Sequence, residues 1–373
     1  EEGGAVLEAS GVKGGLVVYL GCDRGAFAAG LRGGDAYIVQ GLQRDPNRVD
    51  AVRDEIRSHD LYGKVSVRRW NGDRLPYGDN LVNLLIAADP EQVTCREMER
   101  VLVPQGVVMA RGTLDTSGTK LVAAGPTGLE GWTRYEKPRP GDIDHWTHYL
   151  HGPGNNAVAD DDRVGPPRHL QWKAGPMWSR SHEFASSVQT LVSAEGRLIG
   201  VIDEGIIGQP RGVPALWTLL AYDAFNGIRL WRRPCDRIPP HALVAIGDRI
   251  YVTLKARGPL SILDADSGEI RRTADETGRV NEIAFFEDRV ILSTQLPVER
   301  GKSAPHVAAA DPDDGHLLWK RAAEGVANNT LIAGDGRVAY YDGAELVCLS
   351  LDDGTEVWRT PVKTGGRGYA ILY

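Results

Sequence analysis

Residues 221–231 read AYDAFNGIRLW, residues 309–319 read AADPDDGHLLW, and residues 348–358 read CLSLDDGTEVW. A weaker copy at residues 262–272, ILDADSGEIRR, lacks the final Trp. The glycines of these copies are separated by 41, 47 and 39 residues and are Gly227, Gly268, Gly315 and Gly354. A period near 40 residues with several short strands per unit is typical of β-propeller blades.

Each part of the repeat has a physical role in a blade. Asp and Gly favour a tight turn between neighbouring strands, because Gly accepts a positive φ. The Trp offers a large apolar surface that can pack between adjacent blades. Four copies in register therefore predict blades rather than isolated hairpins.

The sequence before residue 138 has a different character, because strands and helices alternate there. This alternation predicts a parallel sheet covered on both faces. Expected strands are residues 16–20, 36–39, 65–69, 81–87 and 107–110, and expected helices are residues 47–59 and 91–102. The chain is thus predicted to be an α/β Rossmann-like domain (residues 1–137), a linker at the propeller entrance (138–164), and an all-β propeller (165–373).

The pattern AxDxxxGxxxW resembles the tryptophan docking repeat of propellers of the pyrroloquinoline quinone (PQQ) type. That repeat is shared by quinoprotein alcohol dehydrogenases and the outer-membrane assembly lipoprotein. The resemblance implies seven or eight blades, whereas about four are recognisable, so we expect a fragment of a longer protein or a partner that completes the ring. Residues 165–172 (GPPRHLQW) could supply the outer strand of a closing blade.

Four motifs of the N-terminal region resemble class I S-adenosylmethionine (SAM) methyltransferases in order and spacing. They are VYLGCDRG at residues 18–25, GLQRD at 41–45, NGDRLP at 71–76 and EMERVLVPQG at 97–106. The resemblance implies a glycine loop that approaches the cofactor, an acid for the ribose hydroxyls and an acid for the adenine amino group. The positions that match are Gly21, Asp23, Gly25, Gln43 and Asp73.

Three of these motif positions depart from the family pattern. Tyr19 replaces the first acid, Asp23 replaces the central glycine, and Gln43 replaces the ribose acid. Gln can still hydrogen-bond a hydroxyl, but the charge-assisted bond is lost. Two interpretations follow: a degenerate Rossmann domain kept as a docking module, which we favour, and a domain that still binds SAM.

Two polar clusters lie outside these motifs. The linker sequence GDIDHWTHYLHGPGNN at residues 141–156 contains His145 and His148, which are candidate ligands for a transition metal or parts of a polar cap on the propeller. Arg180, His182 and Glu183 are candidates for the mouth of the propeller channel or for surface ion pairs. No metal, catalytic residue or PQQ site can be assigned, so we expect PQQ to be absent.

The net charge and the distribution of apolar residues argue against two classes of function. The 373 residues carry a formal net charge of -7 without a basic block, which argues against nucleic-acid binding, and no apolar run is long enough to span a membrane. We expect a binding or scaffold protein whose propeller loops take a protein or a small molecule. The alternatives are an active SAM methyltransferase whose propeller positions the substrate, and then a quinoprotein-type oxidoreductase. The propeller type favours the periplasm or cell envelope, whereas SAM binding would favour the cytoplasm.

Overall fold

The structure is a computed structural model that describes residues 1–163, 165, 170–175, 186–205, 215–298, 302–363 and 370–372. The chain divides into two compact units. The first comprises Glu1–Ile143, Asp162–Ala174 and Tyr222–Trp231, and the second comprises Asp144–Asp161, Gly175–Ala221 and Arg232–Tyr373. The domain limits at residues 137 and 164 stay predictions.

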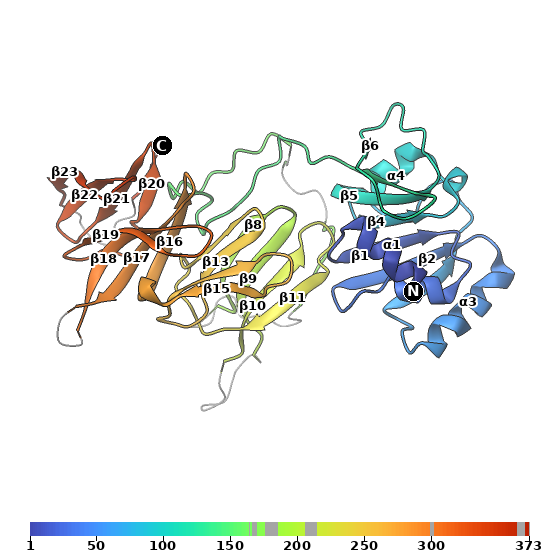
Figure 1. The fold of residues 1–373 in the computed structure, drawn as a ribbon, viewed down its shortest axis with the longest axis horizontal. Helices are drawn as coiled ribbons and strands as arrows, with labels where there is room; N and C mark the ends of the chain where they lie inside the picture. The colour runs from blue at the N-terminus through green and yellow to red at the C-terminus, as the bar shows by residue number, and fades with distance from the viewer. Residues whose placement is uncertain are drawn as a thin grey trace. The chain divides into compact units, whose positions relative to one another are not determined.

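The first unit is built on a seven-stranded mixed sheet with the order β3-β2-β1-β4-β5-β7-β6 (Figure 1). The first five strands are parallel, and the last two pair antiparallel. The strands are β1 (Gly15–Leu20), β2 (Tyr37–Gln43), β3 (Val65–Arg69), β4 (Val82–Ala87), β5 (Leu102–Arg111), β6 (Val122–Ala123) and β7 (Trp132–Glu136). The helices are α1 (Glu2–Ser10), α2 (Gly25–Gly30), α3 (Pro46–Ser58), the 3₁₀ turn η1 (Pro90–Gln92) and α4 (Cys95–Val101).

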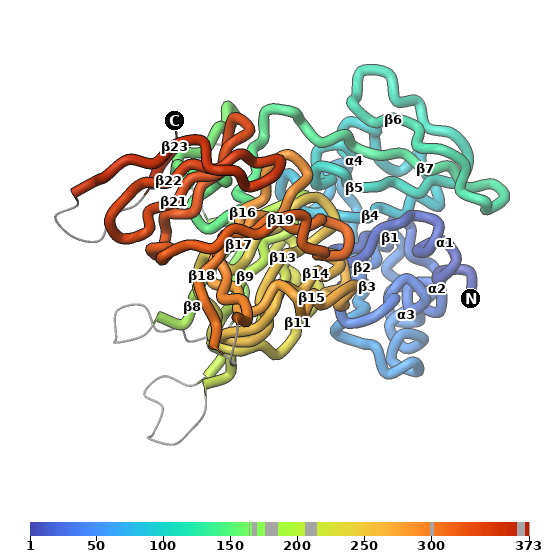
Figure 2. The backbone as a smooth tube through the Cα atoms, turned by 60° about the vertical axis from the view of Figure 1, so that its left-hand side comes forward, coloured from blue at the N-terminus to red at the C-terminus, as the bar shows by residue number. Residues whose placement is uncertain are grey.

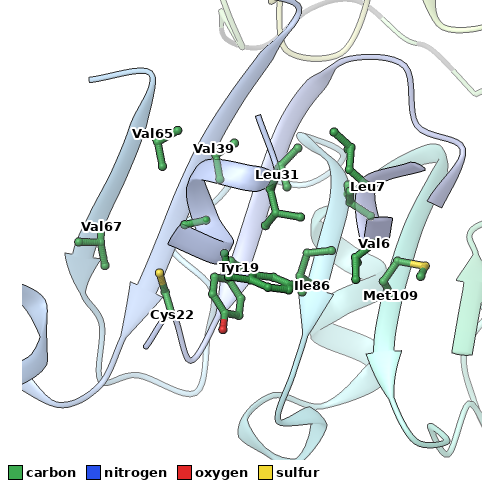
Figure 3. Packing of buried hydrophobic residues seen from close by; sticks show 14 of the residues in the cluster. Val6, Leu7, Tyr19, Cys22, Leu31, Val39, Val65, Val67, Ile86 and Met109 are labelled. Carbon is green, nitrogen blue, oxygen red and sulfur yellow. The ribbon is translucent and has the colours of Figure 1, made fainter. Parts of the chain in front are cut away.

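The apolar run of β1 explains why this sheet is buried on both faces. Successive side chains of a strand point to opposite faces. Val17 and Tyr19 therefore join one core cluster with Val39, Val65 and Ile86. Figure 3 shows Tyr19 among its neighbours in this cluster. Val18 and Leu20 join a second cluster on the other face. The predicted Rossmann-like α/β fold is confirmed.

One predicted helix begins later than expected. The sequence predicts a helix from residue 91, whereas α4 begins at Cys95 after the separate turn η1. The Thr94 hydroxyl accepts a hydrogen bond from the Glu97 N–H, 3.3 Å away. This contact caps the helix at Thr94, because a Thr side chain satisfies a first-turn donor that the helix itself leaves unpaired.

The β-strands that follow the linker form four four-stranded antiparallel sheets (Figure 2). The strands of each blade follow in chain order from the innermost strand outward. The first blade consists of β8 (Val188–Ala194), β9 (Arg197–Asp203), β10 (Trp217–Asp223) and β11 (Arg229–Pro234), and the second of β12 (Leu243–Ile246), β13 (Arg249–Thr253), β14 (Leu260–Asp264) and β15 (Ile270–Ala274). The third blade consists of β16 (Arg279–Phe286), β17 (Arg289–Pro297), β18 (Ser303–Ala310) and β19 (Leu317–Ala322), and the fourth of β20 (Ile332–Gly334), β21 (Arg337–Tyr341), β22 (Glu345–Ser350) and β23 (Glu356–Pro361). The innermost strands β8, β12, β16 and β20 neighbour one another in sequence order. The predicted incomplete propeller is confirmed.

The four repeat glycines adopt the predicted positive φ, and Trp319 makes the predicted docking contact. The glycine φ angles are 71° at Gly227, 70° at Gly268, 76° at Gly315 and 70° at Gly354. Within the second unit, the Trp319 ring covers Gly354, and its Nε1 donates to the Leu351 carbonyl oxygen at 2.8 Å. A side chain at Gly354 would collide with this ring, so Gly is required for both its φ and its lack of a Cβ.

Trp172 makes the same contact in the first unit. Its ring covers Gly227, and its Nε1 donates to the Ala224 carbonyl oxygen at 3.0 Å. Residues 170–172, the described end of the segment predicted to close a blade, have no strand structure. The segment therefore supplies the docking Trp, while its role as an outer strand stays a prediction.

No described helix combines the length and the apolar character needed to cross a lipid bilayer.

Candidate functional site

The positions that the methyltransferase resemblance singles out lie at the carboxyl ends of the parallel strands. Gly21 follows β1, Gln43 ends β2, and Gln92 belongs to the turn after β4. Strand order reverses between β1 and β4, which is where open α/β sheets bind their ligands. The candidate cofactor site is therefore this edge of the sheet in the first unit.

Both the nitrogen and the oxygen of the Gln43 side-chain amide form hydrogen bonds with backbone groups. Its Nε2 donates to the Cys22 carbonyl oxygen at 2.9 Å, and its Oε1 accepts from the Asp45 N–H at 2.9 Å. Only 6% of the residue is exposed. Ribose hydroxyls would have to compete with both backbone contacts for this amide.

The glycine loop is also occupied by side chains of this chain. Gly21 has a φ of 68°, and a Cβ there would lie 2.9 Å from the Gln92 Nε2. The Gly25 N–H donates to the Glu55 carboxylate. In methyltransferase-like loops the backbone is the surface that meets the cofactor, and here part of that surface is covered.

Two departures from the family pattern, Tyr19 in place of an acid and Asp23 in place of a glycine, contact each other. The Tyr19 hydroxyl donates to the Asp23 Oδ1 at 2.8 Å, and the Tyr19 ring packs against Phe27 with centroids 4.9 Å apart. Burial, together with the neighbouring Asp23 carboxylate, raises the pKa of Tyr19. The phenol therefore keeps its proton at physiological pH and donates a hydrogen bond to the Asp23 carboxylate.

Arg44 lies across the adenine side of the edge. Its Nη2 donates to the Gln92 carbonyl oxygen at 2.8 Å and reaches the Gly72 carbonyl oxygen at 3.5 Å, while its guanidinium stacks over Trp70 at 4.7 Å. Asp73, the predicted adenine-side acid, is exposed in the loop after β3. No local pattern marks Arg44, Gln92 or Glu55, because their contacts come from chain segments far apart in the sequence.

The linker residues His145 and His148 belong to the second unit, and both already contact other residues of this chain. His145 Nε2 lies 3.2 Å from Glu195 Oε1. His148 Nδ1 is 2.7 Å from the Thr147 hydroxyl oxygen, and His148 Nε2 accepts from the Phe285 N–H at 2.9 Å. Within the described ranges, no group of three His, Cys, Asp or Glu side chains is arranged to hold a metal ion.

Residues 146–155, which we call the crossing segment, run over the innermost strand of every described blade. The Ser193 N–H donates to the Trp146 carbonyl oxygen at 2.7 Å, and the Ala245 N–H donates to the Thr147 carbonyl oxygen at 3.0 Å. Phe285 of the third blade donates to His148, and the Ala333 N–H of the fourth donates to the Pro153 carbonyl oxygen at 3.0 Å.

The four donors occupy equivalent places in their blades. Each lies four residues before the Arg that opens the next strand, at Arg197, Arg249, Arg289 and Arg337. Innermost strands line the central channel of a propeller. The crossing segment therefore lies against the ends of β8, β12, β16 and β20, on the side that a propeller turns toward its central channel. The predicted mouth residues Arg180, His182 and Glu183 lie outside the described residues.

Comparison with known proteins supports both modules. Residues 217–371 match the family described as outer membrane protein assembly factor BamB, a PQQ-type propeller family. The N-terminal region is 33% identical over 118 residues to the methyltransferase GfsG of Streptomyces halstedii, covering 28% of this chain and 42% of that protein. The chain joins a methyltransferase-like module to a PQQ-like propeller module.

Solved structures resemble one module or the other. A quinohemoprotein alcohol dehydrogenase from Comamonas testosteroni has a TM-score of 0.38 and 12% identity, covering 60% of this chain and 42% of that one. A SAM-dependent methyltransferase from Aquifex aeolicus has a TM-score of 0.30 and 14% identity, covering 36% of this chain and 87% of that one. The chain spans about two-fifths of the length of the curated methyltransferase that it matches.

Proposed function

We propose that this protein is a binding or scaffold protein in which the methyltransferase-like module no longer uses SAM and the propeller module carries the binding function. The observation that carries the proposal is Gln43, whose amide is turned to the Cys22 and Asp45 backbone where the family holds a ribose acid. A carboxylate accepts ribose hydroxyls with charge-assisted bonds that an amide cannot replace.

The covered glycine loop and the Arg44 contacts support the same proposal. SAM binding at this edge would require Gln92 to move from Gly21 and Arg44 to leave the carbonyl oxygens of Gly72 and Gln92. Each displaced contact subtracts from the affinity that the cofactor gains. The residues present therefore fit SAM poorly.

The propeller module suits a binding role because the crossing segment contacts the innermost strand of each described blade at one end and leaves the loops of the other end for a ligand. A ligand or partner is then taken on the loops of the opposite end. We further propose an envelope location, in keeping with the propeller type and with a module that has lost its use for SAM.

Isothermal titration of SAM into the full chain tests the proposal. We expect the wild type to give no saturable heat, and the Asp73→Asn variant to give the same trace. Asp73→Asn removes the charge of the predicted adenine-side acid without changing its shape, and Asp73 is exposed, so this variant reports on SAM binding at the predicted site. A saturable wild-type isotherm that Asp73→Asn weakens would contradict the proposal and favour the alternative, an active methyltransferase whose propeller positions the substrate.

A further inference from the structure

A polar cleft opens in the second unit between the second and third blades. Its volume is about 460 Å³, and it is lined by Arg257, Arg279, Asn281, Gln295 and Ser303. A volume of this size is in the range of small-molecule sites in proteins. All five side chains that line the cleft among the described residues are polar, which distinguishes the cleft from an apolar packing defect.

The cleft lies at the end of the blade opposite the crossing segment. In the β16–β17 hairpin, Arg279 pairs with Gln295 at one end, and Phe286 pairs with Arg289 at the other, next to Phe285. Six residues separate Arg279 from Phe285, which corresponds to about 20 Å along a strand. The cleft is therefore at the end of the third blade that lies away from the crossing segment.

A rigid frame holds Arg279 and Arg257 in place. Thr277 is buried, accepts from the Leu260 N–H at 2.8 Å, and its carbonyl oxygen accepts from the Thr294 hydroxyl. The Val280 N–H donates to the Gly258 carbonyl oxygen at 3.1 Å, which ties the loop bearing Arg257 to β16.

A β-bulge directs Asn281 to the cleft. The register shifts between Val280 and Glu282, which leaves Asn281 without a partner on β17. Bulges re-aim side chains and are frequent next to functional sites. In this strand the bulge separates Asn281, which lines the cleft, from Glu282, which is buried.

Both guanidiniums are available to a ligand. Over residues 1–163, 186–205, 215–298 and 302–363, neither Arg257 nor Arg279 has an ion pair, and both side chains are exposed. Guanidinium groups bind carboxylate and phosphate oxygens in a bidentate manner, and the amides and hydroxyl add neutral donors.

We propose that this cleft binds a small organic anion that carries carboxylate or phosphate groups. The inference deepens the proposed function, because it rests on the propeller being the binding module and names the class of its ligand. The anion bridges Arg257 of the second blade and Arg279 of the third, so binding also joins the two blades.

Titration of the full chain with succinate, inorganic phosphate and the uncharged succinamide at low ionic strength tests the proposal. We expect saturable binding of at least one anion and none of succinamide. Arg257→Gln and Arg279→Gln should each weaken anion binding by about tenfold or more, because each removes a charge-assisted contact. Succinate binding without phosphate binding identifies a carboxylate ligand, and the reverse identifies a phosphorylated one.

Arg337→Gln is the matched control, because Arg337 is exposed at the hairpin end of the fourth blade and the substitution removes the same charge. The proposal would be overturned if the wild type and all three variants bound the anion equally, or if no anion bound at all. Circular dichroism verifies that each variant is folded. Failure of the proposed function has a different signature, since it appears as SAM binding that depends on Asp73.

Discussion

Trp319 and Trp358 occupy the same position of the repeat but differ in their surroundings. Trp319 is 8% exposed and docks on Gly354, whereas Trp358 is 44% exposed. Trp319→Ala should destabilise the propeller by about 3–5 kcal/mol, and Trp358→Ala by much less, because only the first creates a cavity. Denaturant unfolding followed by circular dichroism measures both, and equal losses would contradict the docking role assigned to Trp319.

Glu282 gives the propeller an unusual pH dependence. Burial raises the pKa of Glu282 from 4.5 to about 7, against the opposing effect of backbone N–H groups of Asn329, Leu331 and Thr330. The folded state therefore binds this proton more tightly than the unfolded chain does. The contribution to stability is full below pH 4.5 and is lost as pH rises through 7, by about 3 kcal/mol.

Glu282→Gln tests this dependence, since Gln does not titrate. Its single amide oxygen keeps one of the two N–H contacts that the carboxylate oxygens accept, and the loss of the other lowers the stability equally at every pH. The free energy of unfolding of the wild type, minus that of Glu282→Gln, should fall between pH 4.5 and 7. The pH dependence of other groups cancels in this difference. A difference that stays constant over that range would show that Glu282 is ionised throughout.

At the scale of elements, the crossing segment depends on an uncharged His148. Burial, with smaller effects from His151 and His241, lowers the pKa of His148 to about 3. Only a neutral ring can accept the Phe285 N–H at Nε2 while Nδ1 faces Thr147. Because the folded pKa is depressed, the stabilisation is present above pH 6.5 and is lost as pH falls toward 3.

His148→Gln keeps an acceptor and removes the titration, so we expect the acid loss of stability to shrink in this variant. Thermal unfolding between pH 4 and 7 measures the effect. His316→Gln is the control, because His316 is exposed and pairs with Glu276. An unchanged acid slope in His148→Gln would mean that the crossing segment does not depend on the neutral ring.

At the scale of the whole molecule, the two compact units have separate cores, and separate cores favour separate unfolding transitions. Ile56 belongs to the core of the first unit and Trp319 to a core of the second. In scanning calorimetry, Ile56→Ala should lower one transition and Trp319→Ala the other. If both substitutions lower a single shared transition, the units unfold as one.

Much of this architecture could be predicted from local patterns. The repeat of Asp, Gly and Trp predicts blades, because turn geometry and apolar docking act within about ten residues of the chain. The apolar runs at β1 and β4 likewise predict buried parallel strands, and β3 has the predicted limits. The start of α4 differs, because the cap at Thr94 outweighs the helical tendency of the residues before it.

The sequence by itself determined the two modules, the blades and the departures at Tyr19, Asp23 and Gln43, since each is written in a short run of residues. Only the tertiary structure decided that Gln43 turns to the backbone, that Gln92 and Arg44 cover the cofactor edge, and that residues 146–155 cross four blades. It also decided the cleft between Arg257 and Arg279. These features join residues far apart in the chain, and long-range contacts form through packing that no local pattern records.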